Sequence, residues 1–570
     1  MNTIRLRTPF EVGDVPLAEY PRPQFARDSY KTLNGYWDYA VFNRNDGFPG
    51  WQGKILVPFS PESLLSGLPE GMQIMPDDVL CYRLKFDVEQ SFLKAHTFLH
   101  FDAVDCVCTV TLNDCELGTH VGGYTAFTFD VSSAIKVGTN VLEVVVTDPS
   151  DTSYHSRGKQ RINHGGIWYT PQSGIWQSVW MESVPATYLK DMTILPDIDR
   201  DKLVVKLDIE GNAQSADVVI MDGNKLLKAH KCFGDTAVID FDGYELWSPE
   251  NPKLYDLAVK VGDDIVRSYF GMRKFSVITD RKGYRRLALN NKPYFHTGVL
   301  DQGYWSDGML TPPSNAALEY DVKLVKSMGF NMIRKHIKIE PMRWYYHCDK
   351  LGMIVWQDMP SGDRGPQWQM HNYFTGEEKH RSAESEANFR KEWKEIIDYL
   401  YSFPSIGVWV PFNECWGQFK TQEIVEWTKA YDPSRLVNPA SGGNHYLTGD
   451  ILDTHHYPNP RLTLLDTNRA TVLGEYGGIG FVMKGHLWEP DRNWGYIRLN
   501  SPKEVTDEYE KYAEMLYKLI GRGFSAGVYT QTTDVEMEVN GLMTYDRKEM
   551  KVEPERIRKI NQKLCNALSK

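Results

Sequence analysis

Two glutamates stand where this chain could do acid–base or nucleophilic chemistry. Glu414 follows a short apolar run at 407–412 and comes directly after Asn413, and Glu475 ends a second apolar run that begins at Thr471. A lone glutamate at a strand end is as often a surface salt-bridge partner. If both runs are buried strands of one parallel barrel, however, both carboxyl groups lie at the rim where catalytic residues gather. Two carboxyl groups facing one cavity, one protonated and one ionised, are the equipment for glycoside hydrolysis.

Polar and aromatic residues end several other runs of the same kind. Strand-like segments end near Asp301, His336, His456, Tyr457 and Tyr529. One such residue is more often structural, but many of them at one rim around a carboxylate pair favour an active site.

Residues from about 279 onward alternate between strand-like and helix-like segments, which predicts the elements that position these groups. Eight apolar runs are candidate barrel strands, at 294–300, 331–336, 353–358, 406–412, 436–439, 451–456, 471–475 and 527–531. Helix-like segments lie at 314–327, 341–350, 384–401, 421–431, 502–522 and 554–568. Ser314 suits a helix N-cap and Pro341 a first helical turn, whereas no helix is evident after the sixth strand. The pattern predicts a (β/α)8 barrel over residues 279–570.

The first half of the chain has the pattern of β-sandwiches. Residues 1–185 show strand-like runs at 84–88, 97–101, 108–112, 126–129 and 141–147, separated by turn residues, which predicts a jelly roll. Residues 186–278 alternate as half-buried strands do, over a length that suits an immunoglobulin-like sandwich. The jelly roll could lend a loop to the active site or serve only as a scaffold, and both interpretations stay open.

Composition excludes several classes of partner. The chain has 570 residues, a net charge of −11 and no block of Lys and Arg, so nucleic acid and anionic membranes are not expected partners. The eight Cys are scattered without zinc spacing, which favours reduced thiols. No apolar run suggests a signal segment or a membrane span. We expect a cytoplasmic protein that uses no metal or cofactor, and homo-oligomerisation stays open.

Two segments around the glutamates resemble signatures of a known enzyme family. Pro411-Phe-Asn-Glu-Cys-Trp416 resembles the acid/base signature of glycoside hydrolase family 2, and Gly474-Glu-Tyr-Gly-Gly478 resembles its nucleophile signature. Segments at 33–37, 57–63 and 122–127 resemble the family's amino-terminal domain, and those at 247–255 and 270–275 its middle domain. The resemblance covers nearly the whole chain and implies two β-sandwiches, a jelly roll and an immunoglobulin-like domain, followed by a TIM barrel.

The resemblance also implies a role for each of these residues. Glu414 is the expected general acid/base and Glu475 the expected nucleophile of a retaining exo-β-glycosidase. Asn413 matches the family residue that binds the sugar 2-hydroxyl, and Tyr457 matches the tyrosine that hydrogen-bonds the nucleophile. Further candidates for contacting the carbohydrate are two stacking walls and three hydroxyl-binding residues, namely Trp416 and Tyr529, and Asp301, His336 and His456.

One departure from the family narrows the sugar. Members that bind uronates carry Asn-x-Lys, which holds the carboxylate, just before a Thr-x-Asp-Arg-Lys segment. This chain has Thr544-Tyr-Asp-Arg-Lys548, but Glu538 and Asn540 stand at the positions of that pair. Because a carboxylate there repels a uronate, the resemblance favours a neutral sugar, with β-D-galactosides first.

Other interpretations stay open. Within the family, the alternatives are a glucuronidase, galacturonidase, mannosidase or arabinose-releasing enzyme. Outside enzymes, the alternative is a carbohydrate-binding protein on an inactive barrel, although such a protein has no need of both Glu414 and Glu475. A metal-assisted hydrolase is disfavoured, because the adjacent His455 and His456 of one strand should point to opposite sides.

Overall fold

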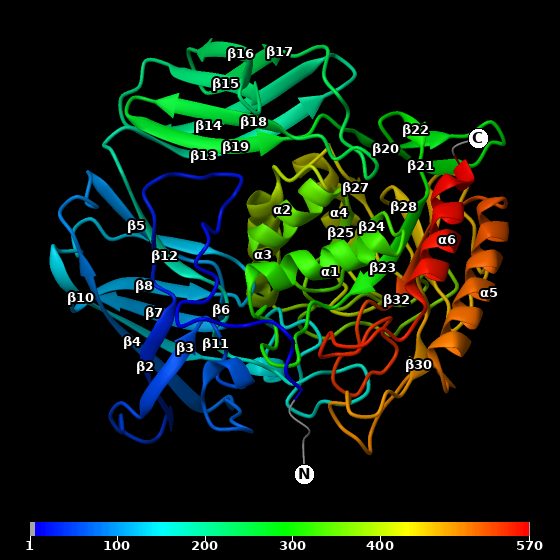
Figure 1. Cartoon of the computed structure of the whole chain (residues 1–570), viewed down its shortest axis with the longest axis horizontal. Coiled ribbons are helices and arrows are strands. Elements are labelled where there is room, and N and C mark those ends of the chain that lie inside the picture. The colour runs from blue at the N-terminus through cyan, green and yellow to red at the C-terminus, as the bar shows by residue number, and fades with distance from the viewer. Residues whose placement is uncertain (1–5, 569–570) are drawn as a thin grey trace.

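The amino-terminal part of the protein is a β-sandwich. A computed structural model describes residues 6–568 and places this sandwich beside the other two parts of the chain (Figure 1). Its sheets have the strand orders β3-β2-β4-β10-β7-β8 and β1-β12-β5-β9. Trp37, Leu99 and Val144 belong to the core that the two sheets share. The strands are β1 (Lys31–Thr32), β2 (Gly35–Asn43), β3 (Gly53–Val57), β4 (Asp78–Val88), β5 (His96–Phe101), β7 (Val107–Leu112), β8 (Cys115–Val121), β9 (Phe127–Asp130), β10 (Gly138–Thr147) and β12 (Val179–Val184).

A second sandwich follows, with its own core around Leu203 and Val259. Its sheets have the orders β13-β14-β17 and β16-β15-β18-β19. Successive side chains point to opposite faces of a strand, so the apolar ones alternate into the core. The strands are β13 (Tyr188–Asp197), β14 (Lys202–Glu210), β15 (Ala216–Asp222), β16 (Lys225–Cys232), β17 (Thr236–Asp240), β18 (Tyr255–Val261) and β19 (Asp264–Phe270).

The remaining chain forms a nearly closed barrel of parallel strands, ordered β27-β26-β25-β24-β23-β32-β29-β28. The strands are β23 (His296–Asp301), β24 (Met332–Lys335), β25 (Ile354–Asp358), β26 (Ile406–Val410), β27 (Leu436–Val437), β28 (Ile451–His455), β29 (Ala470–Gly477) and β32 (Phe524–Thr530). A small sheet of β20 (Phe275–Thr279), β21 (Arg285–Leu289) and β22 (Lys292–Pro293) shares an apolar core with the barrel strands. The predicted fold class, two sandwiches and then a (β/α)8 barrel, is confirmed.

The helices that surround the barrel also match the sequence pattern. They are α1 (Asn315–Ser327), α2 (Met342–Leu351), α3 (Ala383–Leu400), α4 (Thr421–Tyr431), α5 (Pro502–Ile520) and α6 (Pro554–Cys565). Ser314 caps α1, because its hydroxyl accepts a hydrogen bond from the Ala317 amide at 3.2 Å. Pro341 lies one residue before α2 rather than in its first turn, at a position where its missing N–H costs nothing. Residues 456–469, after the sixth strand, contain turns and bends instead of a helix.

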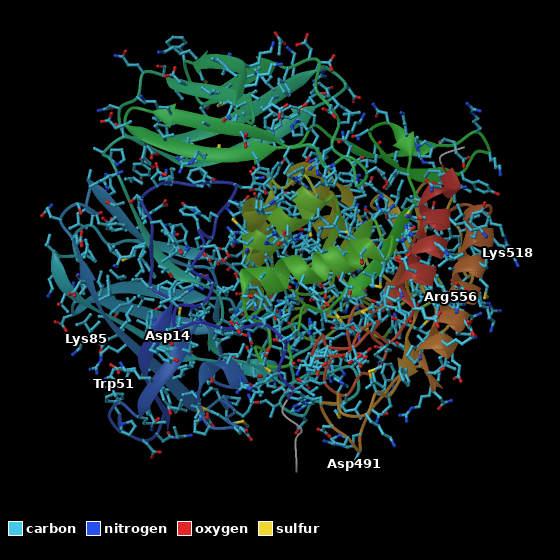
Figure 2. All side chains as sticks on the ribbon, in the orientation of Figure 1. Asp14, Trp51, Lys85, Asp491, Lys518 and Arg556 are labelled. Atoms are coloured by element: carbon cyan, nitrogen blue, oxygen red, sulfur yellow. The ribbon has the colours of Figure 1, made fainter. Side chains whose placement is uncertain are left out.

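Side chains fill the space between the ribbons of the three parts (Figure 2). Charged residues such as Lys85, Asp491 and Lys518 are exposed at the periphery. Within residues 6–568, no helix combines the length and the apolar character that crossing a membrane demands.

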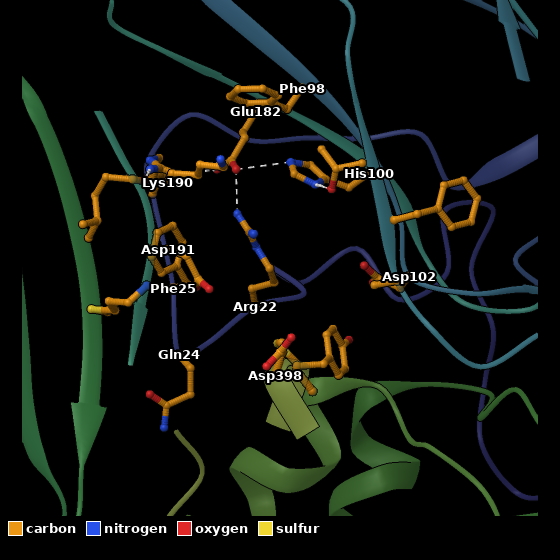
Figure 3. Close-up of a pocket in the computed structure, with 18 of the residues that line it drawn as sticks. Arg22, Gln24, Phe25, Phe98, His100, Asp102, Glu182, Lys190, Asp191 and Asp398 are labelled. Carbon is orange, nitrogen blue, oxygen red and sulfur yellow. Dashed lines mark hydrogen bonds and ion pairs between the residues drawn. The ribbon is translucent and has the colours of Figure 1, made fainter. Parts of the chain in front are cut away.

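A cavity of about 580 Å³ lies where the two sandwiches meet α3 (Figure 3). On its wall, Glu182 of β12 accepts hydrogen bonds from Arg22 at 2.6 Å and from Arg27 at 3.1 Å. Arg27 also donates two bonds of 2.9 Å to Asp264 of the second sandwich. Burial alone would raise the pKa of Glu182, but the Arg22 charge and the bond from His100 hold it well below the usual range. These ion pairs therefore link the first sandwich to the second.

We expect Glu182→Gln to destabilise the protein by about 3 kcal/mol, because it leaves buried guanidinium groups without their anion. The measurement is the thermal melting temperature, which should fall clearly. Glu210→Gln is the matched control, because Glu210 pairs with Lys190 on the surface, where ion pairs contribute little. Equal melting temperatures for the two variants would show that the buried pairs do not hold the sandwiches together.

Candidate active site

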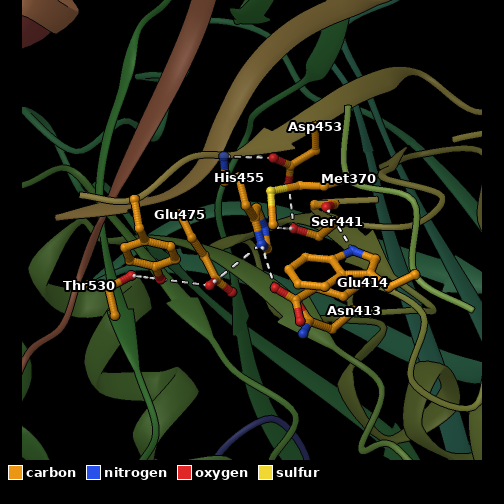
Figure 4. A network of polar contacts seen from close by, with 12 residues as sticks. Met370, Asn413, Glu414, Ser441, Asp453, His455, Glu475 and Thr530 are labelled. Carbon is orange, nitrogen blue, oxygen red and sulfur yellow. Dashed lines mark hydrogen bonds and ion pairs between the residues drawn. The ribbon is translucent and has the colours of Figure 1, made fainter. Parts of the chain in front are cut away.

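The structure brings Glu414 and Glu475 together at one rim of the barrel (Figure 4). Glu414 lies just beyond the end of β26, and Glu475 lies within the last turn of β29 toward its carboxyl end. One carboxylate oxygen of each, together with a ring nitrogen of His455, lie within 4.8 Å of one another. Both side chains are largely buried, at 9% and 6% exposed. Because both strands are parallel, their carboxyl ends meet at the same edge of the barrel.

The environment of Glu475 favours its ionised form. Its Oε1 accepts from Arg334 Nη1 at 3.1 Å, and its Oε2 accepts from the Tyr457 hydroxyl at 2.8 Å. Burial alone would raise the pKa of Glu475, but the positive charges of His455 and Arg334 outweigh it and hold the pKa at about 2. This carboxyl group is therefore an anion at neutral pH.

The environment of Glu414 acts in the opposite direction. Burial raises its pKa above the ordinary value, and the negative charge of Glu475 adds to this, against a hydrogen bond from His455 that lowers it. The two carboxyl groups are thus held in different protonation states by their surroundings, which is the arrangement an acid and a nucleophile need.

His455 lies between the two carboxyl groups. Its Nδ1 is 3.2 Å from Glu414 Oε1 and 3.5 Å from Glu475 Oε2. Its Nε2 is 2.8 Å from the Ser441 hydroxyl, which in turn donates to Asp453 at 2.5 Å. Burial alone would lower the pKa of His455, but the charge of Glu475 and the bond to Glu414 raise it. The ring therefore carries positive charge into the site.

Arg334 of β24 fixes the neighbours of the pair. Its guanidinium donates to Asp358 at 3.1 and 2.9 Å and to Asn413 Oδ1 at 2.7 Å, besides its bond to Glu475. The Asn413 oxygen is thereby occupied, and its amide nitrogen remains as a donor.

Two tyrosines support the nucleophile position. The Tyr457 hydroxyl, which donates to Glu475, also lies 2.7 Å from the Thr530 hydroxyl. The ring of Tyr496 stacks on that of Tyr457 with centroids 3.7 Å apart. Tyr457 is therefore held on two sides, so that its hydroxyl stays directed at the carboxylate.

Other predicted site residues have different surroundings. His336 lies near the pair, with Nδ1 at 2.9 Å from Asp358 and its ring 6.2 Å from that of Trp416. Asp301 accepts from Lys335 at 2.5 Å and belongs to a buried ionic group with Glu340. The structure therefore brings His336 and Trp416 toward the pair, whereas the described contacts of Asp301 lead away from it.

His456 and Tyr529 are placed by the alternation of side chains along their strands. His456 Nδ1 lies 2.7 Å from the Asn459 carbonyl, on the opposite side from His455. Tyr529 is 0% exposed and packs against Tyr476 and Tyr509. The prediction that Tyr529 is a stacking wall for the sugar is wrong, because its ring faces α5 and no ring face is open.

The amino-terminal sandwich contributes to the site, which motif reasoning placed only in general terms. Trp168 packs against Trp416 with ring centroids 4.9 Å apart, and the Lys159 ammonium lies 5.9 Å from the Trp416 ring. The Lys159 charge also acts on both Glu414 and Glu475. No local pattern marks Lys159 as a site residue, since it lies more than 250 residues before Glu414 in the sequence.

Glu538 and Asn540, which stand where uronate-binding members carry Asn-x-Lys, bind each other. The Asn540 amide donates to Glu538 at 2.9 Å, and Gln531 donates to Asn540 at 2.7 Å. Tyr169 of the amino-terminal sandwich also donates its hydroxyl to Glu538. Both residues are buried, at 2% and 0% exposed.

Glu414, His455 and Glu475 could also hold a cation, since their donor atoms are close enough. The Arg334 guanidinium already supplies a positive charge to Glu475, however, which a metal ion would have to face. The absence of a metal from the reaction stays a prediction.

Relatives of known sequence and structure are found over most of the chain. A putative β-glucuronidase of Formosa agariphila is 25% identical over 455 residues, covering 76% of this chain and 49% of the relative. A β-galactosidase of Lactococcus lactis is 26% identical over 459 residues, covering 74% and 42%. The chain thus spans about half the length of these two relatives. The solved β-D-glucuronidase of Dictyoglomus thermophilum is similar with a TM-score of 0.75 at 17% identity, covering 95% of this chain and 98% of that one.

A β-galacturonidase of Eisenbergiella tayi is similar with a TM-score of 0.69 at 17% identity, covering 98% of each chain. At such identities the solved structures support the fold alone. Family matches follow the same order as the three parts of the fold. Residues 61–175 match the glycosyl hydrolase 2 galactose-binding domain-like family, residues 187–273 match glycosyl hydrolases family 2, and residues 282–476 match the TIM barrel domain of that family. With three family 2 domains matched in sequence along one chain, the protein belongs to glycoside hydrolase family 2.

Proposed function

We propose that this protein is a retaining exo-β-glycosidase that removes terminal β-linked sugars, with β-D-galactosides as the favoured substrates. The observation that carries this proposal is the pair of buried carboxyl groups with opposed pKa shifts at one barrel rim. A carbohydrate-binding protein on an inactive barrel would not need a raised and a lowered carboxyl group side by side.

In this mechanism Glu475 attacks the anomeric carbon while Glu414 protonates the leaving oxygen. Glu414 then takes a proton from water, which releases the sugar with retained configuration. Retaining enzymes hold their carboxyl groups about 5–5.5 Å apart, and inverting ones about 6.5–9.5 Å. The oxygen-to-oxygen distance within 4.8 Å supports the retaining route.

The neighbouring residues take supporting roles. Asn413, held through its oxygen by Arg334, offers its amide nitrogen to the sugar 2-hydroxyl, a bond that strengthens as the transition state forms. Tyr457 and Arg334 stabilise the anion of Glu475. Trp416 and Trp168 form an aromatic surface against which a sugar ring or its aglycone can pack.

A neutral sugar is favoured by the buried carboxylate of Glu538 at the position of a uronate-binding group. The second candidate is a β-hexuronidase, acting on glucuronides or galacturonides. It is favoured by Lys159, a cation beside Trp416 and both carboxyl groups, and by the names of several similar proteins. Arg334 and Lys335 are weaker candidates for binding a uronate, because both already pair with carboxylates.

We expect Glu475→Gln to lower kcat on nitrophenyl glycosides by at least about a thousandfold without loss of fold, because the covalent step is lost. Glu414→Ala should be inactive on poor leaving groups and partly rescued by azide on good ones, since azide attacks the glycosyl-enzyme without a base. Circular dichroism controls for folding. A Glu475→Gln enzyme with a near-normal rate would refute the assignment.

The pH dependence of kcat/KM should report the charge of His455. A cation stabilises the anionic forms of both glutamates, so its removal in His455→Asn raises both pKa values. The acid limb, where Glu475 must ionise, and the basic limb, where Glu414 must stay protonated, should both move to higher pH. His456→Asn is the matched control, because His456 binds the Asn459 carbonyl instead. Unshifted limbs in His455→Asn would mean that its charge does not reach the pair.

The sugar is tested with nitrophenyl β-galactoside, β-glucuronide and β-galacturonide. A buried charged contact that lacks its partner costs about 2–5 kcal/mol, so Glu538 should favour the galactoside by at least about 30-fold in kcat/KM. A higher kcat/KM for either uronide would show that the neutral-sugar proposal is wrong. Lys159→Met would then test which cation binds the carboxylate, with loss of activity confined to the uronides.

A further inference from the structure

A second group of potential ligands lies in the amino-terminal sandwich, away from the carboxyl pair. Asp105 ends β6 (Val104–Asp105), Cys106 follows it, and Asp148 follows β10. One donor atom from each lies within 4.8 Å of the others. All three side chains are buried, at 4%, 1% and 4% exposed. The three residues, here called the Asp–Cys–Asp cluster, have no part in the proposed hydrolysis.

A small cavity opens between these side chains. Its volume is about 10 Å³, close to what a single water-sized probe occupies. Ser150 also lines it, and this residue is only 7% exposed. The Ser150 hydroxyl has no hydrogen-bond partner among residues 6–568. A buried hydroxyl without a partner is costly, so its position on this cavity points to an atom that belongs there.

The acidic groups of the cluster have little compensation in the described structure. Asp105 accepts a long hydrogen bond of 3.4 Å from Gln160. Asp148 accepts from the Ser173 hydroxyl and from the Ser150 amide, both at 2.7 Å. The negative groups Glu62 and Glu392 lie close enough to add to the field at Asp105.

The positive group nearest to hand is engaged elsewhere. Arg157 lines the same cavity, but its guanidinium donates to the carbonyls of Ser153 at 3.2 Å and Asp363 at 3.0 Å. Burial, and for Asp105 the charge of Asp148, raise the pKa of both aspartates, and burial raises that of the Cys106 thiol. The cluster must therefore hold protons unless a cation replaces them.

We propose that Asp105, Cys106 and Asp148 bind one zinc ion, with the Ser150 hydroxyl as a fourth donor. Zinc accepts both thiolate and carboxylate ligands and takes four of them in structural sites. Calcium prefers six to eight oxygen ligands, which this cavity cannot supply, and a thiol is a poor ligand for magnesium. On binding, the ion displaces the thiol proton of Cys106 and any carboxyl proton, and these leave to solvent.

The site lies beside the segment that reaches the barrel rim. Gln160, which donates to Asp105, also donates to the Tyr124 hydroxyl at 3.1 Å and directly follows Lys159. Ser156, another residue on the cavity, donates to Glu392 of α3 at 2.6 Å. A bound zinc ion would therefore fix both the loop that carries Lys159 and its contact with the barrel. The inference stands independently of the proposed hydrolase activity.

The first test is the metal content of the purified protein after equilibration with zinc and removal of free metal, by mass spectrometry of the elements. We expect about one zinc per chain in the wild type, and loss of at least nine-tenths of it in Asp148→Asn and in Cys106→Ser. Asp507→Asn, in an exposed acidic group on α5, and Glu475→Gln, in the other donor cluster, should each retain one zinc. Retention of the ion by Asp148→Asn or Cys106→Ser, or its absence from the wild type, would overturn the proposal.

A second test guards against variants that fail to fold. Cobalt in place of zinc should give a thiolate-to-cobalt absorption band in the wild type that is missing in Cys106→Ser. Chelator treatment should lower the melting temperature of the wild type and leave that of Asp148→Asn unchanged. A wild type that takes up magnesium or calcium but no zinc, or that melts alike with and without chelator, would also contradict the proposal.

Discussion

Arg334 is the group on which the geometry of the candidate active site depends. It is fully buried, and its planar guanidinium bonds to Asp358, Asn413 and Glu475, which come from three different segments of the barrel. Burying a carboxylate is costly unless a counter-charge with good geometry is present. One guanidinium with five donors in a fixed plane satisfies that requirement for two carboxylates and orients an amide as well. The ionised state of Glu475 and the direction of Asn413 follow from this single contact.

His455 adds the asymmetry between the two glutamates. Both carboxyl groups are buried, so desolvation raises the pKa of each, and only the distribution of positive charge separates them. Glu475 has Arg334 and Tyr457 as direct donors, whereas Glu414 has a contact with His455 and the repulsion of its neighbour. The site therefore differentiates two chemically identical side chains through their surroundings, as acid–base pairs in other enzymes do.

The sandwiches are part of this arrangement as well as a support for it. The segment around Lys159 and Trp168 brings a cation and an aromatic ring to Trp416, and Tyr169 binds Glu538 on the other side of the rim. The position of that segment depends in turn on how firmly the first sandwich is held. Arg27 and Glu182 link it to the second sandwich through buried ion pairs, and the Asp–Cys–Asp cluster lies at the base of the segment.

The sequence by itself determined the eight barrel strands, the Ser314 cap and the pairing of Glu414 with Glu475. These depend on local periodicity and on one rule, that parallel strands expose their carboxyl ends at the same rim. Only the tertiary structure decided which side of a strand end faces the cavity. His455 lies in the site and His456 does not, and Tyr529 packs against Tyr509 while the next residue, Thr530, contacts Tyr457. Because successive side chains alternate, a shift of one residue reverses the assignment, and periodicity near a strand end does not fix it. Lys159 could not be found from sequence at all, since its place beside Glu414 depends on how two separate domains pack.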